Sequence, residues 1–489
     1  MLLHDLLDPV ETDQTVEARG GLDVDIRSVE HDSRAVTPGA LFCCIPGERN
    51  DGHDFAPAAE AAGAAACLVE RFVAVTIPQV RVASVRRALG PLCARFHGDP
   101  SCALRVLGVT GTNGKTTITY LLERVAGAAG ERAAILGTTG ARVGGRELPM
   151  PHTTPEATDL QALLAGMRDA GARTVAMEVS SHALDQHRVD ATRFTAVCFT
   201  NLSHDHLDYH GSLGAYFDAK ARLFTREFTD RAAVCVDEDF GRALEMLARD
   251  NGLDVATYGL ESAADVTADG IELGSDGTAF TMVLGGERRR VSTPLVGRFN
   301  VVNALGAATT AQLAGYTPDA IVRGLSGAIV VPGRLERVDA GQPFPVFVDY
   351  AHTPDALRAV LEAARPLVGP GGRLIVVFGC GGDRDRAKRP AMGAVAARAA
   401  DVAILTSDNP RSEDPAAIAR DVLAGVEGTA VHEVELDRRV AIRDALRAAR
   451  AGDVVVIAGK GHETGQTRGG VTVPFDDRVV AREELGARP

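Results

Sequence analysis

The sequence predicts an α/β protein with three domains, each built around its own sheet. Its 489 residues exceed what one hydrophobic core usually organises. Short apolar runs alternate with helical patterns along most of the chain, as they do in parallel sheets covered by helices. Pro332, Gly333 and Arg334 indicate a hinge. We predict a small N-terminal α/β domain (residues 1–100), a central domain with a parallel sheet (101–332) and a C-terminal Rossmann-like α/β domain (333–489).

The N-terminal part has the pattern of a small α/β unit. Apolar runs predict strands around an alanine-rich helix; these are residues 41–45, 66–69 and 80–82, with the helix at 56–65. Polar residues and glycines predict turns at 32–34 and 47–52. Each turn is either a plain surface turn or a loop whose arginine, Arg34 or Arg49, faces a diphosphate. The residues alone leave both interpretations open.

The stretch 104–125 carries the clearest local signal in the chain. An apolar strand pattern runs into a Gly-Thr-Asn-Gly loop, and a helix follows. The apolar side chains of this helix recur at i, i+3, i+4 and i+7, which places them on one face: Ile118, Leu121, Leu122 and Val125. Strand, glycine loop and helix in this order predict a cradle for a nucleoside triphosphate.

The residue types in this loop suit phosphate chemistry. Gly111 and Gly114 let backbone N–H groups approach phosphate oxygens without a Cβ in the way. Lys115 adds a positive charge at the helix N-terminus, and the Thr116 hydroxyl can bind Mg²⁺. The strict motif has glycine where this chain has Val109. The alternative is a glycine-rich turn that only packs, but its strand–helix context favours phosphate binding.

The rest of the central part predicts a parallel sheet with an insert. Four runs predict strands: 132–137, 174–181, 195–202 and 232–237. The runs 174–181 and 195–202 are apolar on both faces, as central parallel strands should be. Residues 266–291 alternate more loosely around glycines and predict an antiparallel insert. An alanine-rich helix is expected at 299–310.

The C-terminal part predicts a second α/β unit with its own ligand loops. Strands are expected at 346–349, 373–378, 401–406 and 453–457. Glycine-rich or charged segments follow three of them, at 379–385, 407–411 and 459–463. Ligands bind beyond the carboxyl ends of strands in open parallel sheets, so these segments are the expected ligand loops.

Composition narrows the class of protein. The net charge of −13 argues against a nucleic-acid surface. The eight cysteines form no C-x-x-C pair, which favours buried free thiols in a reducing compartment. The first residues are acidic, and no apolar run approaches the length of a membrane span. We predict a cytoplasmic protein without membrane insertion or nucleic-acid partners.

Two acidic features lie downstream of the loop. Glu178 ends a predicted strand, where a carboxylate can hold Mg²⁺; the alternative is an incidental carboxylate beside a helix-capping Ser180 or Ser181. Residues 201–210 contain three histidines and two aspartates, but no second cluster has the spacing of a zinc site. A harder ion is therefore favoured. Lys220 follows in a helical run and, taken alone, would be a solvated surface charge.

Ten motifs in one order resemble those of the Mur ligases, the ATP-dependent amide-bond-forming enzymes of bacterial cell-wall precursor synthesis. They cover nearly the whole chain: GVTGTNGKTT, MEVSSHALDQHRV, TNLSHDHLDYHGS, Ala219-Lys220, GRFNVVNALGA, PGRLE, VDYAHTPDAL, GCGGDRD, DNPR and GKGHE. The likeness is greatest to the type that adds the third residue of the stem peptide.

The resemblance implies a set of nucleotide and metal residues. The catalytic group would be Lys115, Glu178, His206 and Lys220. Mg²⁺ would be held by Thr116, Glu178, His206 and Lys220, the lysine carrying a carbamate derived from CO₂. The ATP-binding residues would be Gly111, Thr112, Asn113, Gly114, Lys115, Thr116, Thr117, Asn303, Arg334 and Asp349.

It also implies two further binding sites. The UDP-substrate site would comprise Ser33, Glu48, Arg49, Asn50, Thr153, Thr154, Ser180, Gln186 and Arg188, with His152 departing from the Asn of one form of the family. The amino-acid site would comprise Arg384, Asp408, Asn409, Arg411, Gly459 and Glu463. Arg411 offers a planar fork for the distal carboxylate of meso-diaminopimelate, and Glu463 suits its distal ammonium. The alternative is that DNPR is only a turn before the helix after Pro415.

The expected reaction follows from these sites. ATP would phosphorylate the D-Glu γ-carboxylate of UDP-N-acetylmuramoyl-L-alanyl-D-glutamate, and the amine of meso-diaminopimelate would attack the resulting acyl phosphate. The enzyme is expected to be a monomer. Alternatives are the same reaction with L-lysine, or a ligase like folylpolyglutamate synthetase, which lacks a comparable N-terminal domain and the DNPR loop. A nucleotide-dependent switch is disfavoured because the chain has no guanine-specifying NKxD motif.

Overall fold

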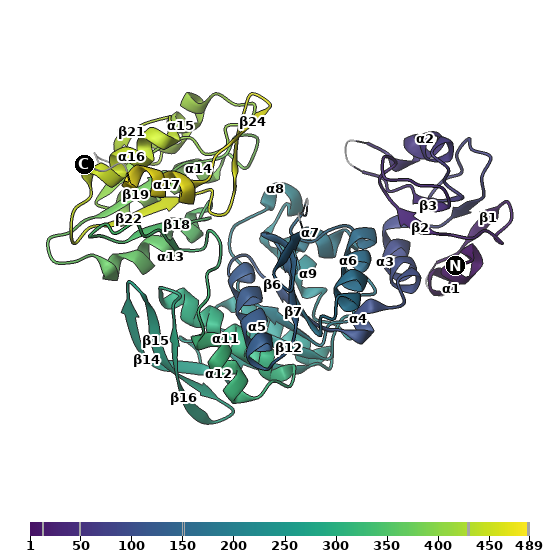
Figure 1. Ribbon diagram of the computed structural model, residues 1–489, viewed down its shortest axis with the longest axis horizontal. Coiled ribbons are helices and arrows are strands. Elements are labelled where there is room, and N and C mark those ends of the chain that lie inside the picture. Colours follow the sequence, from purple (N-terminus) through teal and green to yellow (C-terminus); the bar gives the residue numbers. More distant parts are fainter. Residues whose placement is uncertain (12–13, 48–49, 149, 151, 428–430, 487–489) are drawn as a thin grey trace.

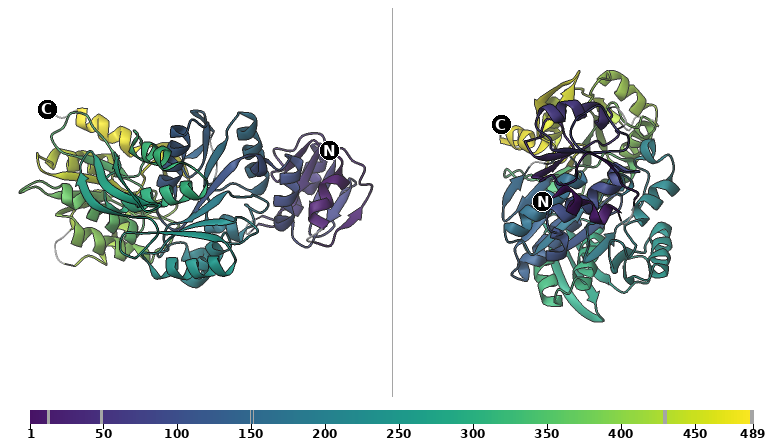
Figure 2. Two further views of the ribbon diagram at one scale, coloured as in Figure 1. Left: turned by 90° about the horizontal axis from the view of Figure 1, so that it is seen from below. Right: turned by 90° about the vertical axis from the view of Figure 1, so that its right-hand side faces the viewer.

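The computed structural model shows three domains arranged along one long axis, and it describes residues 1–489 except 12–13, 48–49, 149, 151, 428–430 and 487–489. The N-terminal domain lies at one end, the C-terminal domain at the other and the central domain between them (Figures 1 and 2). Separate sheets form the three bodies, which confirms the predicted α/β class with three domains. The precise domain boundaries stay predictions.

A five-stranded sheet organises the N-terminal domain, in the order β1-β5-β4-β3-β2. Its strands are β1 (Glu17–Arg19), β2 (Ser28–Glu30), β3 (Ala40–Cys43), β4 (Ala66–Val69) and β5 (Gln79–Arg81). Its helices are α1 (Leu3–Glu11), η1 (Gly52–Phe55), α2 (Ala56–Ala61) and α3 (Val85–Phe96), with α4 (Pro100–Ala103) leading into the central domain. Every residue of β3 and β4 is buried, as expected for inner parallel strands.

The central domain contains an eight-stranded sheet in the order β13-β12-β11-β6-β10-β7-β8-β9. Its strands are β6 (Arg105–Thr110), β7 (Ala133–Gly137), β8 (Gly140–Val143), β9 (Arg146–Leu148), β10 (Thr174–Glu178), β11 (Ala196–Phe199), β12 (Arg231–Cys235) and β13 (Asp254–Tyr258). The strands from β13 to β7 are parallel, and β8 and β9 add an antiparallel edge. Strand β6, which leads into the phosphate loop, therefore lies in the middle of the sheet.

Helices cover both faces of this sheet. They are α5 (Lys115–Ala128), α6 (Ala157–Asp169), α7 (Ser181–Asp185), α8 (Leu207–His210), α9 (Leu213–Ala221), α10 (Asp239–Asp250), α11 (Arg298–Leu313) and α12 (Pro318–Ser326). The predicted antiparallel insert is confirmed as β14 (Thr267–Gly274), β15 (Gly277–Leu284) and β16 (Glu287–Thr293). Phe280, Met282 and Val291 of the insert join the core that contains α5 and α11.

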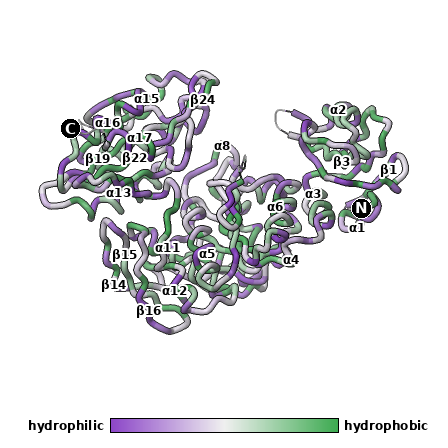
Figure 3. The backbone as a smooth tube through the Cα atoms, in the orientation of Figure 1, coloured by the Kyte–Doolittle hydropathy of each residue, from purple (hydrophilic) through white to green (hydrophobic). Residues whose placement is uncertain are grey.

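A six-stranded sheet in the order β17-β18-β22-β19-β20-β21 forms the C-terminal domain. Its strands are β17 (Glu336–Arg337), β18 (Val346–Asp349), β19 (Leu374–Phe378), β20 (Val402–Leu405), β21 (Val431–Val434) and β22 (Val454–Ala458), with a separate hairpin of β23 (Gly465–Arg468) and β24 (Val471–Pro474). Its helices are α13 (Pro354–Ala364), η2 (Arg365–Leu367), α14 (Lys388–Ala399), α15 (Pro415–Leu423), α16 (Arg438–Ala448) and α17 (Asp477–Gly486). The hydrophobic colour in Figure 3 follows β19 and β22, both buried throughout.

The predicted elements were confirmed in kind, with shifted ends. The strand expected at 174–181 ends at Glu178, because Ser180 caps α7 by accepting a hydrogen bond from the Ala183 N–H at 3.2 Å. The helix expected at 56–65 ends at Ala61. The cysteines are free; all are buried except Cys102. Among the described residues, no helix is long and apolar enough to cross a membrane.

A buried ion pair links the last two helices to the sheet. Arg438 of α16 and Asp477 of α17 have fully buried side chains 2.6 Å apart, and Arg438 also donates to the Ala458 carbonyl at the end of β22. Asp477→Ala leaves this guanidinium without its counter-charge. We expect the free energy of opening of the C-terminal domain, measured by hydrogen exchange in β22, to fall by about 3–5 kcal/mol.

The neighbouring pair provides a matched control. Arg439 of α16 binds Glu483 of α17 at 2.8 Å, but both side chains are about half exposed. Glu483→Ala should lower the same free energy by less than about 1 kcal/mol. Equal losses in the two variants would show that burial of the Arg438–Asp477 pair does not stabilise the domain.

Candidate active site

The phosphate loop has the predicted strand–loop–helix form. It connects β6 to α5, and its glycines have left-handed backbone angles, with φ of +142° at Gly111 and +88° at Gly114. A Cβ on Gly111 would lie 1.8 Å from Thr200 Oγ1, and one on Gly114 would lie 2.4 Å from Asn303 Oδ1. Both positions therefore require glycine on grounds of space and backbone conformation.

The end of β11 holds this loop in place. The Thr200 hydroxyl donates to the Asn113 carbonyl at 2.6 Å, and the Asn113 N–H donates to Asn201 Oδ1 at 2.9 Å. Val109, which departs from the strict phosphate-loop motif, is a fully buried residue of β6 and pairs with Glu178 of β10. Its position belongs to the sheet, so the departure leaves the loop itself intact.

Two lysines approach the same carbonyl group of the loop. Lys115 Nζ donates to the Gly111 carbonyl at 2.9 Å and to the Thr112 carbonyl at 2.8 Å. Lys220 Nζ donates to the Gly111 carbonyl at 2.8 Å and lies 4.3 Å from the centre of the Tyr216 ring. Burial lowers the pKa of both amines, and for Lys220 the nearby charge of Lys115 lowers it further, to well below its ordinary value.

The alternative of a solvated surface charge is wrong for Lys220. Its side chain is 1 % exposed, because α9 packs it beneath the phosphate loop. A buried ammonium is costly unless it is compensated.

Glu178 lies at the carboxyl end of β10, next to the loop. Its Oε1 accepts from the Thr138 N–H at 2.9 Å and its Oε2 from the Thr138 hydroxyl at 3.1 Å, and the residue is 1 % exposed. Gly137 leaves room for this carboxylate, since a Cβ there would lie 2.4 Å from Oε1. Ser180 does cap the next helix, as the alternative interpretation of this turn expects. The role of Glu178 as an Mg²⁺ ligand stays a prediction.

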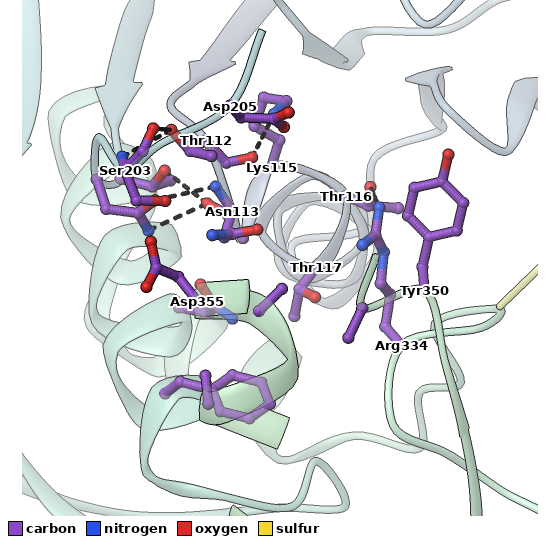
Figure 4. A pocket seen from close by; sticks show the side chains of 18 of the residues that line it. Thr112, Asn113, Lys115, Thr116, Thr117, Ser203, Asp205, Arg334, Tyr350 and Asp355 are labelled. Carbon is purple, nitrogen blue, oxygen red and sulfur yellow. Dashed lines mark hydrogen bonds between the residues drawn. The ribbon is translucent and has the colours of Figure 1, made fainter. Parts of the chain in front are cut away.

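The C-terminal domain reaches the loop through the hinge. Arg334 Nη2 donates to Thr116 Oγ1 at 3.0 Å, and its guanidinium lies 4.8 Å from the centre of the Tyr350 ring (Figure 4). Asp349 accepts from the Leu335 N–H at 2.6 Å, and burial raises its pKa. These residues place a cationic side chain of one domain on the first turn of α5 in another.

One cavity of about 700 Å³ lies between the central and C-terminal domains. Residues of the loop, of the sheet edge and of the hinge line it: Thr112, Asn113, Gly114, Lys115, Thr116, Thr117, Thr138, Thr153, Glu178, Ser180, Asp205, His206, Asn303, Arg334, Asp349 and His352. It therefore brings together the predicted ATP residues, apart from Gly111, with Glu178 and His206. Lys220 does not line it, because it lies behind Gly111.

The donor set suits Mg²⁺ shared with phosphate oxygens. The Thr116 hydroxyl and the Glu178 carboxylate line the cavity together with Asp205 and His206. Burial lowers the pKa of His206 to about 4, so its imidazole is neutral near pH 7. The described residues contain no group of three or more His, Cys, Asp or Glu side chains that could hold a metal by themselves. Mg²⁺ typically binds one or two carboxylates plus substrate phosphates, and these residues fit that pattern.

The residues predicted for the UDP substrate form two groups on different domains. In the central domain, Thr154 Oγ1 donates to the Glu178 carbonyl at 2.8 Å, and Arg188 donates to the Thr154 carbonyl and to Gln186 Oε1. Thr153 and Ser180 line the cavity beside them. Ser33 and Asn50 belong to the N-terminal domain, and Glu48 and Arg49 lie outside the described residues. His31 Nδ1 lies 2.7 Å from Thr158 Oγ1, which holds the Ser33 turn against α6.

The residues predicted for the amino acid form a cluster in the C-terminal domain. Asn409 Nδ2 donates to Glu463 Oε2 at 2.8 Å, and a Cβ on Gly459 would lie 3.1 Å from Asp408 Oδ2. Arg411 has a left-handed backbone (φ +54°), and its guanidinium donates to the Gly382 carbonyl at 2.6 Å. Arg384 is exposed on the adjacent loop. The loops after β19, β20 and β22 thus meet as predicted.

Several residues with structural roles at these sites were not predicted. Glu156 pairs with Arg188 at 3.0 Å and with Arg86 of the N-terminal domain at 3.4 Å. Arg389 is fully buried and binds Glu413, just after the DNPR run. Their partners are distant in sequence, so no local pattern marks them. Lys460 lies inside the GKGHE run but was not singled out.

Comparison with known proteins identifies the family. The chain matches the Mur ligase middle domain over residues 109–311, the Mur ligase glutamate ligase domain over 333–461 and the Mur ligase family catalytic domain over 25–97. A Solibacter usitatus protein named UDP-N-acetylmuramoyl-L-alanyl-D-glutamate–2,6-diaminopimelate ligase is 45% identical over 467 residues, 94% of each chain. A Streptomyces coelicolor protein of the same name is 46% identical and covers 94% of this chain and 92% of its own.

Solved structures extend the likeness to the fold. One titled as a UDP-N-acetylmuramoyl-L-alanyl-D-glutamate–2,6-diaminopimelate ligase has a TM-score of 0.71 and 35% identity, and the match covers 100% of this chain and 99% of that one. Full-length identity of this level and matches in all three domains lead to one conclusion. The chain belongs to the Mur ligase family.

Proposed function

We propose that this protein is the cytoplasmic, monomeric, ATP-dependent ligase that adds meso-diaminopimelate to UDP-N-acetylmuramoyl-L-alanyl-D-glutamate in peptidoglycan precursor synthesis. The observation that carries the proposal is the cavity between two domains, where the phosphate loop and Glu178 face residues of the C-terminal domain. Relatives with the corresponding name, 45% identical along the chain, support the choice of substrates.

Charge and position assign the roles in the first step. The backbone N–H groups of residues 111–116 and the ammonium of Lys115 bind the triphosphate. Thr116, Glu178 and His206 would hold Mg²⁺, and the ion would supply positive charge to offset that of the phosphate oxygens. A γ-carboxylate oxygen of D-Glu attacks the γ-phosphorus, the bond to ADP breaks, and an acyl phosphate forms. The amine of the amino acid then attacks the acyl carbon, phosphate leaves, and the amine loses a proton.

The state of Lys220 is a further part of the proposal. Its burial and the charge of Lys115 favour the neutral amine, which is the form that attacks CO₂. A bond forms between Nζ and the carbon, one proton is released, and an anionic carbamate results. This anion would offset the charge of Lys115, whose ammonium shares the Gly111 carbonyl with Lys220.

The other predicted residues are assigned to the binding of the UDP substrate, ATP and the amino acid. We assign Ser33, Glu48, Arg49 and Asn50 to the uridine nucleotide, and Thr153, Thr154, Ser180, Gln186 and Arg188 to the remainder of that substrate. Asn303, Arg334 and Asp349 are assigned to the adenosine of ATP. Arg384, Asp408, Asn409, Arg411, Gly459 and Glu463 are assigned to diaminopimelate. L-Lysine would leave the guanidinium of Arg411 without a carboxylate, which favours diaminopimelate over it.

Amino-acid preference tests the proposed function. Purified protein is given Mg-ATP, the UDP-dipeptide and either meso-diaminopimelate or L-lysine, and phosphate release is measured. We expect a kcat/KM for diaminopimelate at least about 100-fold above that for L-lysine, because a polar pocket left unpaired rejects the shorter ligand. No phosphate release with either amino acid would contradict the ligase proposal. Equal rates with the two amino acids would show that the residues assigned to diaminopimelate do not discriminate between them.

Substitution of Lys220 tests the carbamate. Lys220→Ala should lower kcat by at least about 10²-fold, since the anion that offsets the Lys115 ammonium beneath the phosphate loop is lost. A short carboxylate such as formate should partly restore the rate if the missing group is anionic. Lys220→Arg is the matched control: it keeps a cation but has no amine that reacts with CO₂, so it should stay inactive. Full activity of either variant would remove Lys220 from the mechanism.

A further inference from the structure

Lysine is rare in this protein. Of its 52 lysines and arginines all but four are arginines, the exceptions being Lys115, Lys220, Lys388 and Lys460. Arginine serves even where a cation is fully buried in the C-terminal domain, as at Arg389 and Arg438. A lysine therefore marks a place that needs a compact point charge with three rotatable donors, not a planar fork. Lys115 and Lys220 already belong to the site described above, and Lys460 is as fully buried as Lys220.

The ammonium of Lys460 gathers three acceptors from two loops. Its Nζ donates to Glu463 Oε2 at 3.0 Å and to Asn409 Oδ1 at 3.2 Å, and it lies 3.7 Å from Asp408 Oδ1. Asp408 and Asn409 follow β20, whereas Lys460 and Glu463 follow β22. Lys460 itself is 0 % exposed, so these contacts form without competition from water.

These contacts hold one oxygen of the Glu463 carboxylate and leave the other available to a ligand. Oε2 accepts from both Lys460 Nζ and Asn409 Nδ2, at 3.0 and 2.8 Å. Oε1 accepts no hydrogen bond from the described residues, and the side chain is 32% exposed. The Asn409 amide is equally constrained, because its Oδ1 also accepts from the Thr467 N–H at 3.0 Å. A single oxygen of Glu463 is thus presented outward in a set orientation.

The surrounding backbone explains why a guanidinium does not replace this ammonium. A Cβ on Gly459 would lie 3.1 Å from Asp408 Oδ2, and one on Gly461 would lie 2.7 Å from Tyr350 Cβ. The loop that carries Lys460 is therefore packed tightly on both sides. A planar fork with five donors would have to displace these neighbours to fit.

We propose that Lys460 is a positioning residue of the amino-acid site. Its buried ammonium holds Glu463 and Asn409 so that Glu463 Oε1 receives the distal ammonium of the incoming diamino acid. It also offsets the repulsion between the Asp408 and Glu463 carboxylates, which would otherwise turn away from each other. The inference rests on the proposed function, because it assumes that the cluster binds an amino acid.

Steady-state kinetics of Lys460→Met and Lys460→Arg test this role. We expect the KM for meso-diaminopimelate to rise at least about tenfold in both variants, with the KM values for ATP and for the UDP-dipeptide within about twofold of wild type. The same Lys460→Met substitution is then made in a Glu463→Gln background. If Lys460 acts through Glu463, its effect on the KM for diaminopimelate largely disappears there.

A matched control separates positioning from loss of stability. Arg373 binds the fully buried Asp453 at 2.7 Å. The two residues directly precede β19 and β22, so they lie at the other end of these strands from the amino-acid loops. Arg373→Met removes a cation from a buried carboxylate of the same domain, and it should lower the melting temperature without raising the KM for diaminopimelate. Should Lys460→Met misfold, Lys460→Arg carries the test, because it keeps the charge.

The outcomes distinguish this inference from the proposed function. An active wild type whose KM for diaminopimelate is unchanged by both Lys460 substitutions, or changed no more than by Arg373→Met, overturns the inference alone. An equal effect of Lys460→Met in the wild-type and Glu463→Gln backgrounds also overturns it. A wild type that releases no phosphate with any amino acid overturns the proposed function, and the inference with it.

Discussion

Two ammonium groups meet at one backbone carbonyl, and the active site is arranged around that concentration of positive charge. Lys115 and Lys220 lie 2.9 and 2.8 Å from the Gly111 oxygen. Such proximity is costly unless anions offset it. The proposed anions come from different sources: the triphosphate on the open side of the loop, and a carbamate on the buried side. The proposed binding of ATP and the proposed carbamate on Lys220 would both offset the positive charge of these two ammonium groups.

The same loop connects nucleotide binding to the position of the C-terminal domain. Arg334 crosses the hinge to donate to Thr116, the hydroxyl proposed as an Mg²⁺ ligand. Gly333 beside it has φ of +63°, and a Cβ there would lie 2.1 Å from the His462 N–H nitrogen. The hinge therefore touches both the phosphate loop and the run that carries Lys460 and Glu463. The hinge residues thus connect the proposed nucleotide site directly to the loops proposed for the amino acid.

Sequence reasoning succeeded where the signal was local. The phosphate loop was predictable because strand, glycines and helix lie within a short stretch, and the antiparallel insert because a loose alternation broken by glycines marks its segment. The burial of Lys220 was not predictable from its own helix, since it depends on how α9 packs beneath Gly111. Arg438 and Asp477 are 39 residues apart, and neither carries a local sign of its partner. The hairpin β23–β24 was missed because its second strand is exposed along its whole length.

In the proposed reaction the γ-phosphoryl group passes to a substrate carboxylate and not to water. This transfer is tested most directly by supplying the UDP-dipeptide with ¹⁸O in the D-Glu γ-carboxylate and analysing the phosphate released in unlabelled water. An acyl-phosphate mechanism leaves one carboxylate oxygen on phosphorus when the amine displaces it, so each released phosphate should carry one labelled oxygen. Phosphate free of label, formed together with the amide product, would contradict the account.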